Sequence, residues 1–254
     1  MSVAKARTAR RVLLGSAALA ATWLIAVWPP PVWWRDHEPR CTAMMRLRSD
    51  CRTGERADGH VPLRAAPRVL ERMVIIAEDS RFRTHLGIDF VEIGEALTAG
   101  GRRGASTITQ QLAKNLYLSP SRSPWRKLKE AVTAVRLELA LPKDRIIALY
   151  LSVAEWGPGV WGAAAASEAY FGVPLSRLNH EQAAGLAATL PHPRTSNPAF
   201  HPARMRARRA LILARYYGGP AAVPREPEEL SVPVLPPFEL PPIPPLPPIL
   251  VDEP

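Results

Sequence analysis

The stretch from Val12 to Trp28 constrains this chain most, because it holds 17 residues without a single charge. As a helix it spans about 26 Å, close to the thickness of bilayer hydrocarbon. Four bases precede it and no acid does, which predicts an N-terminal tail (1–11) in the cytoplasm and the body outside. Tryptophans gather toward the far end of the uncharged segment, as in an interfacial belt (Trp23, Trp28, Trp33 and Trp34). We therefore predict a single-pass transmembrane anchor over 12–34.

Two other interpretations of this segment compete with the anchor. A cleaved signal peptide has the same layout, and Ala18-Leu19-Ala20 offers a small-x-small cleavage site, although it lies inside the apolar run. A buried core helix is the weaker alternative, since such a helix rarely lacks charge over this length.

Charge is distributed unevenly along the chain. Lys and Arg number 33 against 23 acids, and residues 35–219 alone carry a net charge of +11. A body this basic favours an anionic partner, such as nucleic acid, an anionic lipid or a diphosphate. A hydrophobic content of 47% excludes wholesale disorder. Two cysteines exclude a disulfide-built scaffold and a four-cysteine zinc site, and whether Cys41 and Cys51 pair stays open.

After the anchor the pattern divides the chain into three parts. Residues 35–66 have little periodicity and are expected to form a stalk or irregular cap. Residues 67–218 show repeated helical spacing, with apolar stripes near 69–77, 108–116, 128–139 and 146–151 and no convincing strand or hairpin signal. An all-α domain is therefore predicted. Residues 219–254 form a proline-rich tail, expected to be extended or disordered, because 13 of the last 35 residues are proline.

A carboxylate ends the first of these helical stretches. Glu78 follows an apolar helix and heads a polar loop that runs to Gly87. A carboxylate partly shielded by apolar neighbours is suited to act as a general base. Taken alone, however, an acid at a helix end is more often a solvated charge.

The next polar stretch begins a helix near Ser106. Thr107, Gln110, Gln111 and Lys114 follow at spacings of three or four and so share one face. That face carries hydroxyl, amide and ammonium groups without an acid, which suits an anion. A merely solvated face would normally include Glu or Asp, although the residues alone do not decide between the two.

A third stretch begins another helix at Pro124. Arg126 and Lys127 lie four and three residues before Glu130, on one helix face. Arginine can bind phosphate through two hydrogen bonds and lysine as a point charge. The alternative is an ordinary ion pair worth about 0.3–0.5 kcal/mol.

Together these motifs resemble the biosynthetic peptidoglycan glycosyltransferases (glycosyltransferase family 51), and specifically the short monofunctional transglycosylases. The resemblance extends over roughly residues 65–215 in matching order. Its blocks are Glu78–Gly87, Gly104–Asn115, Arg126–Glu130, Lys143–Phe171 and Glu181–Pro198. The chain departs from the pattern at Ala148 and Ser152, where an acid and an amide are usual, which puts fine structure or efficiency there in doubt.

The resemblance implies an all-α, lysozyme-like, two-lobed domain behind the anchor. It implies polymerisation of lipid II into β-1,4-linked glycan strands with release of undecaprenyl diphosphate, at the bacterial inner membrane with the catalytic domain on the periplasmic side. Glu78 would act as the base and Glu130 would assist as the second catalytic residue. The residues expected to hold the substrate are Lys114, Arg122, Arg126, Lys127, Thr107, Gln111 and Asn115.

No obligatory cofactor is expected, although a divalent cation (Mg²⁺ or Mn²⁺) at the diphosphate is compatible with the pattern. Expected partners are lipid II, the nascent strand and other cell-wall synthesis proteins. Nucleic acid does not fit the export topology. A penicillin-binding transpeptidase is excluded, because the one Ser-x-x-Lys lies at Ser2–Lys5 and Lys-Thr-Gly is absent.

Two functional alternatives stay open. A lysozyme-like enzyme that cleaves glycans also uses a glutamate at a helix end, but it needs no diphosphate site. The cations Lys114, Arg126 and Lys127 favour synthesis over cleavage. A membrane-anchored scaffold without catalysis is the second alternative, with the proline-rich tail as its binding segment.

Overall fold

The computed structural model describes residues 3–48, 51, 66–100, 104–121, 123–200, 202–220 and 222–224. Three sequence predictions concern residues outside these ranges. They are the role of Arg122, most of the segment between Cys51 and Ala66, and the proline-rich tail beyond 224.

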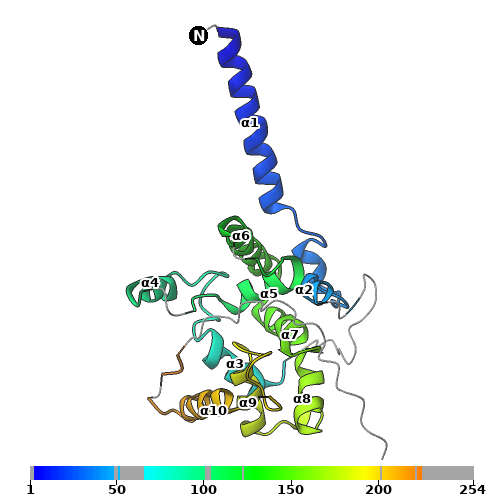
Figure 1. Ribbon diagram of the computed structural model, residues 1–254, viewed down its shortest axis with the longest axis vertical. Helices are drawn as coiled ribbons and strands as arrows, with labels where there is room; N and C mark the ends of the chain where they lie inside the picture. Colours follow the sequence, from blue (N-terminus) through cyan, green and yellow to red (C-terminus); the bar gives the residue numbers. More distant parts are fainter. Residues whose placement is uncertain are drawn as a thin grey trace, which may run out of the picture.

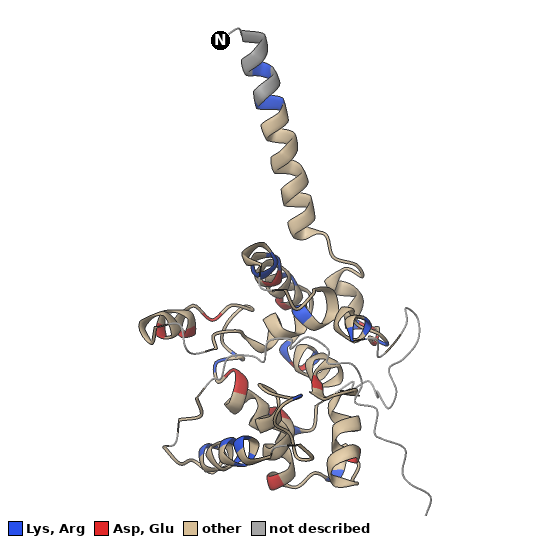
Figure 2. Ribbon diagram, in the orientation of Figure 1, with Lys and Arg blue, Asp and Glu red and all other residues tan. Residues whose placement is uncertain are grey.

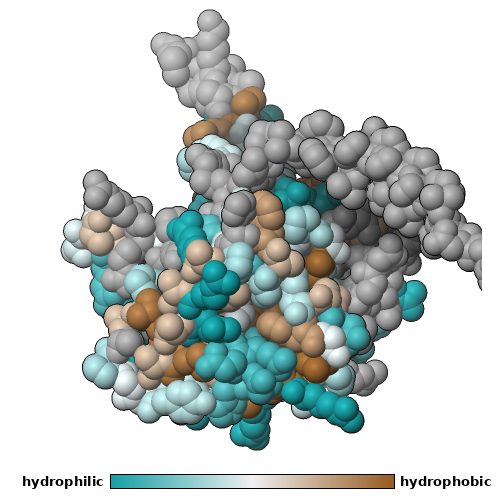
Figure 3. All heavy atoms as spheres, turned by 60° about the horizontal axis from the view of Figure 1, so that its bottom comes forward, coloured by the Kyte–Doolittle hydropathy of each residue, from teal (hydrophilic) through white to brown (hydrophobic). Residues whose placement is uncertain are grey.

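Helix α1 (Val3–Ile25) projects from the body (Figure 1). Its apolar side chains are exposed, among them Leu13 and Leu19. In the described part of the chain, no helix combines the length and the hydropathy that a membrane crossing requires. The helix ends at Ile25, so the predicted anchor over 12–34 is not one continuous helix. The face of the body opposite α1 is a mosaic of hydrophilic and hydrophobic residues (Figure 3).

The segment that follows α1 packs on the body, as a cap would, and does not extend away from it as a stalk would. It contains a 3-10 helix, η1 (Pro31–Arg35), and the short helix α2 (Ala43–Leu47). Trp34 is buried, and its Nε1 donates a hydrogen bond to the hydroxyl of Tyr117 over 2.6 Å. Trp34 is therefore a core residue and not part of an interfacial belt. A disulfide joins Cys41 and Cys51, which answers the question that the sequence left open.

The body is mostly helical, as predicted, and its helices form two packed groups (Figure 1). Helices α3 (Arg68–Glu78), α9 (His180–Thr189) and α10 (Ala203–Tyr216) form one group. Helices α5 (Ile108–Tyr117), α6 (Pro124–Ala140) and α7 (Lys143–Val153) form the other, and α7 also contacts α8 (Ala163–Phe171). The remaining elements are α4 (Phe90–Thr98) and the 3-10 helix η2 (Leu175–Arg177).

Most predicted apolar stripes are the buried faces of their helices. Ile108, Leu112 and Leu116 are buried on α5, as the spacing predicts. The stripe predicted for α6 is wrong, because Leu128 and Leu139 are exposed. The buried face of α6 instead carries Glu130, Thr133, Ala134 and Leu137. Both α1 and η1 contact α6, which gives this helix apolar neighbours on more than one side.

A short antiparallel hairpin, β1 (Glu155–Gly157) and β2 (Val160–Trp161), was not expected from the sequence. Its two tryptophans are fully buried. Tyr170 donates a hydrogen bond from its hydroxyl to the carbonyl of Trp156 over 2.8 Å. A Cβ at Gly157 would collide with that hydroxyl and displace it from its hydrogen bond, which favours glycine at this position. Burial, together with the nearby Glu155 carboxylate, raises the pKa of Tyr170 to about 12, so its hydroxyl keeps its proton.

Candidate active site

Glu78 is the last residue of α3, and its side chain is buried between the two helix groups. Nε2 of Gln111, on α5, donates a hydrogen bond to Oε2 of Glu78 over 3.1 Å. The hydroxyl of Tyr150, on α7, donates to Oε1 of Gln111 over 2.7 Å and so fixes which way that amide points. The carboxylate is therefore oriented from the α5–α7 group. The alternative of a solvated charge does not apply, since Glu78 is only 7% exposed.

Arg208 holds the other carboxylate oxygen of Glu78, and the sequence prediction did not include it. Its Nη2 lies 3.2 Å from Oε1 of Glu78 and 2.7 Å from the carbonyl oxygen of Ala77. Basic residues line α10 (Figure 2), but only Arg208 shares the buried face with Met205 and Ile212. Met205, Arg208 and Ile212 follow one another at spacings of three and four, as residues on one buried helix face do. An arginine between two apolar residues at this spacing was the signal that could have identified it.

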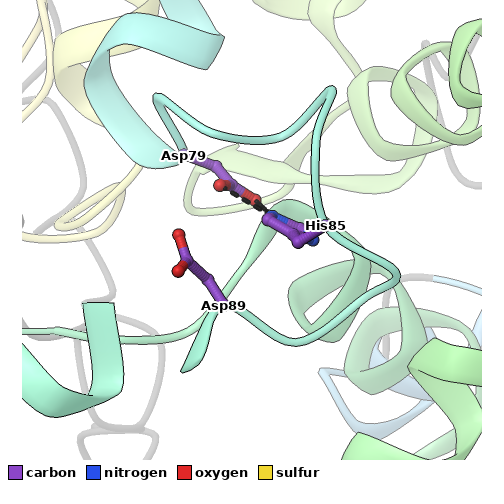
Figure 4. A group of neighbouring side chains, drawn as sticks. All are labelled: Asp79, His85 and Asp89. Carbon is purple, nitrogen blue, oxygen red and sulfur yellow. Dashed lines mark hydrogen bonds and ion pairs between the residues drawn. The ribbon is translucent and has the colours of Figure 1, made fainter. Parts of the chain in front are cut away.

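Asp79, the residue after Glu78, fixes the start of α5. Its Oδ2 accepts the backbone N–H of Ile108 over 3.0 Å. Nε2 of His85 lies 3.0 Å from both carboxylate oxygens, and Nδ1 of His85 accepts the backbone N–H of Gly87 over 3.2 Å (Figure 4). These partners assign the ring proton to Nε2. The loop after Glu78 and the helix that carries Gln111 are thereby held in one arrangement.

Asp79, His85 and Asp89 place their ligand atoms within 4.8 Å of one another, which makes them a candidate metal site (Figure 4). Asp89, however, accepts two hydrogen bonds from Arg81, at 2.9 and 3.1 Å, and one from the N–H of Glu92 as the N-cap of α4. Burial works to raise the pKa of Asp89, but these hydrogen bonds outweigh it and lower the pKa below its ordinary value. The carboxylates already serve as helix caps beside a guanidinium, so the group does not suit a cation.

Thr107 belongs to the helix start and not to an open surface. It is the N-cap of α5 and forms a capping box with Gln110. Its hydroxyl donates to the carbonyl of Gly87 over 2.7 Å, and the side chain is fully buried. Both residues therefore act structurally, unlike their helix neighbours Gln111 and Lys114.

Gln111, Lys114 and Asn115 line a pocket with a volume of about 60 Å³. Arg48, at the end of α2, and Arg194 line it as well, and both pair with Glu155, at 3.6 and 2.8 Å respectively. The remaining lining residues are mostly apolar: Met44, Pro120, Tyr150, Ala154, Leu190 and Pro193. Three of the predicted substrate residues thus lie together, one of them hydrogen-bonded to Glu78.

Arg126, Lys127 and Glu130 form a second cationic group, on α6. Nη1 of Arg126 lies 2.5 Å from Oε2 of Glu130, and Lys127 pairs with Oε1. Lys127 also donates to the hydroxyl of Ser106 over 2.8 Å, just before α5 begins, and is about half exposed. Glu130 is only 2% exposed, so its carboxylate is balanced by these two cations and not by solvent.

The loop between α5 and α6 connects the two groups. Pro120 lines the pocket, and the carbonyl of the next residue, Ser121, accepts a hydrogen bond from Nε of Arg126. The pocket cation Lys114 and the α6 cations therefore flank one loop. Arg122 belongs to this loop but lies outside the described residues.

The two departures on α7 are paired with each other. Ala148 and Ser152 are both buried, and the hydroxyl of Ser152 donates to the carbonyl of Ala148 over 3.0 Å. The expected acid and amide are thus replaced by a small residue and a hydroxyl that bonds within its own helix.

The chain is similar to known proteins along most of its length. A family model described as Transglycosylase matches residues 47–217. The biosynthetic peptidoglycan transglycosylase of Azoarcus sp. (strain BH72) is 44% identical over 202 residues, covering 76% of this chain and 87% of that protein. A protein with the same name from Thiobacillus denitrificans is 39% identical over 222 residues, 83% of this chain and 95% of that protein.

Proposed function

Because this chain belongs to the transglycosylase family, we propose a reaction scheme in which Glu78 acts as its general base. The chain is a peptidoglycan glycosyltransferase, which polymerises glycan strands for the cell wall. Its substrate is lipid II, a disaccharide-peptide linked to undecaprenyl diphosphate. The steps below assign this chemistry to residues of this chain.

In the chemical step, Glu78 removes the proton from the 4-hydroxyl of the acceptor sugar. That oxygen attacks C1 of the growing strand's terminal sugar, the C1–O bond to the diphosphate breaks, and undecaprenyl diphosphate departs with the electron pair. Attack from the opposite face inverts C1 and gives a β-1,4 bond. Gln111 and Arg208 each take one lone pair of the Glu78 oxygens, which leaves further lone pairs for the proton.

The charge that develops on the departing diphosphate needs cations nearby. Arg126 and Lys127 supply them from α6, with Lys114 across the loop and Arg122 as a further expected contact. Glu130 acts as a positioning residue, because its carboxylate holds both α6 cations. Phosphate oxygens can replace carboxylate contacts to the exposed part of Lys127 as the substrate binds.

The residues at this diphosphate site do not fit a divalent cation well. Both oxygens of Glu130 already face a guanidinium and an ammonium. A cation there would have to displace one of them, so no step of the scheme passes through a metal.

We further propose that the apolar segment containing α1 anchors the chain in the bacterial inner membrane, with the lysozyme-like, two-lobed body on the periplasmic side. Three observations support this proposal. Basic residues precede the apolar run, Trp125, Leu128 and Leu139 are exposed on the helix that α1 contacts, and the disulfide suits an oxidising compartment. Anchoring would raise the effective concentration of a lipid-linked substrate.

The observation that supports the scheme is the hydrogen bond between Glu78 and Gln111, because Gln111 also lines the cationic pocket. The test is to incubate the purified full chain in detergent with lipid II and, in a parallel reaction, with preformed glycan. The length of the glycan strands is measured in both reactions. New long strands support the synthase. Shortened fragments from preformed glycan would indicate a cleaving enzyme instead, and no change to either substrate would indicate a scaffold.

A further inference from the structure

Arg48 holds an unsatisfied donor at the pocket beside the proposed base. Its side chain is only 12% exposed, and its Nε is buried without a hydrogen-bond partner in the described structure. A buried donor on a charged group is costly to leave unpaired. One side of the guanidinium is weakly paired, with Nη2 3.6 Å from Glu155. The Nε of Arg48 is therefore available to donate a hydrogen bond to an acceptor on a bound ligand.

The pocket around Arg48 has the charge that an anion requires. Arg48 and Arg194 contribute two positive charges besides Lys114, which the reaction scheme assigns to the diphosphate, and Glu155 contributes one negative charge. A volume of about 60 Å³ gives room for one small polar group and not for a sugar ring. The planar fork of arginine matches a carboxylate particularly well.

Arg48 is held in place by covalent and apolar contacts. It directly follows α2, whose Met44 and Met45 are buried in the core. The Cys41–Cys51 disulfide closes the segment that contains this helix. Such a rigid position is typical of a group that binds a ligand without reorganising first.

We propose that this pocket binds a carboxylate of the peptide carried by the lipid-linked disaccharide, with Arg48 as its main contact. The inference rests on the proposed function, because Gln111 lines the pocket and also contacts Glu78. A disaccharide held at Glu78 would bring its attached peptide to this pocket. The diphosphate is a different anion, and the cations of α6 are available to it.

The test measures binding of two probes, lipid II with free peptide carboxylates and lipid II with the same peptide fully amidated. The dissociation constants are measured in the Glu78→Gln background, where turnover does not interfere. Arg48→Lys keeps the charge but removes Nε and the planar fork. Arg46→Lys on the same helix is the matched control, since Arg46 is exposed and its hydrogen bond to the Cys41 carbonyl is long, at 3.5 Å.

We expect the free acid to bind about 10-fold or more tightly than the amide, as for a hydrogen bond to a charged group. Arg48→Lys should remove this difference by weakening the free acid alone, and Arg46→Lys should leave it unchanged. Equal binding of the two probes would overturn the proposal. Equal weakening of both by Arg48→Lys would also overturn it, since the anion would then be the diphosphate. If the wild-type protein, with Glu78 intact, did not polymerise lipid II, the proposed function would be contradicted. The difference in affinity between the two probes would still test the pocket.

Discussion

Nη2 of Arg208 lies 3.2 Å from Oε1 of Glu78, although the two residues are 130 positions apart in the chain, and both side chains are buried. The ion pair connects α10 to the end of α3 at the proposed catalytic base. It explains why a helix outside the predicted motif blocks is part of the site.

Replacing Arg208 by Ala should destabilise the protein and impair polymerisation. The change leaves the Glu78 carboxylate buried without its cation, so we expect the free energy of unfolding to fall by about 3 kcal/mol. Chemical denaturation measures the loss. The matched control is Arg209→Ala, because Arg209 pairs at 3.4 Å with a mostly exposed Glu181 and should cost less than about 1 kcal/mol. Similar losses for the two variants would show that the buried pair has no special role.

Lys127→Ala should weaken substrate binding, because it removes a half-exposed cation from the proposed diphosphate site. We expect the apparent KM for lipid II to rise about 10-fold, and kcat to fall as well, because Lys127 also stabilises the charge on the departing diphosphate. Lys129→Ala is the control, since Lys129 lies over the ring of Trp23 instead. An unchanged KM for Lys127→Ala would argue against the cationic site on α6.

Gly87→Ala should destabilise the fold around the loop that follows Glu78. Gly87 has a φ of +88°, and an added Cβ would lie 2.9 Å from the carbonyl carbon of Ala134 on α6. Gly100 also has a positive φ, of +73°, but faces open space. Both variants carry the backbone penalty of about 1–2 kcal/mol. Thermal unfolding should therefore show an additional loss of about 1–3 kcal/mol for Gly87→Ala alone, and equal losses would contradict the close approach.

Asp89→Asn should lower stability near neutral pH but not in acid. The folded state lowers the pKa of Asp89, so the charged carboxylate stabilises the fold above its unfolded pKa, about 4. That contribution is lost as the pH falls through the lower, folded-state pKa. We expect the free energy of unfolding of wild type to exceed that of the variant by about 1 kcal/mol at pH 7. The two values, measured by chemical denaturation as a function of pH, should converge below pH 4. A constant difference across this range would disprove the coupling to Arg81.

Much of the fold was predictable, because local periodicity determines which residues a helix buries. The stripes of α3, α5 and α7 were read directly from the sequence. The stripe of α6 was not, since this helix is apolar on more than one side and α1 and η1 also pack on it. Trp34 was misplaced for a related reason: its partner Tyr117 is 83 residues away, and no local pattern reports such a contact.

The motif blocks located Glu78, Gln111, Lys114 and the α6 cations. They did not separate ligand contacts from helix caps, because Thr107 and Gln111 lie on one helix face while only Gln111 reaches the pocket. The sequence analysis missed Arg48 and Arg208, because an arginine among other basic residues is normally predicted to be exposed to solvent. Their burial depends on distant neighbours, Glu155 for Arg48 and Glu78 for Arg208.

The most direct test of the central claim is polymerisation of lipid II by Glu78→Gln compared with wild type. The amide keeps the size of the side chain but cannot accept the proton in the chemical step. We predict that glycan formation falls at least about 1000-fold while lipid II binds with unchanged affinity and thermal unfolding still shows a folded protein. Strands formed at a rate close to that of wild type would contradict the assignment of Glu78 as the base.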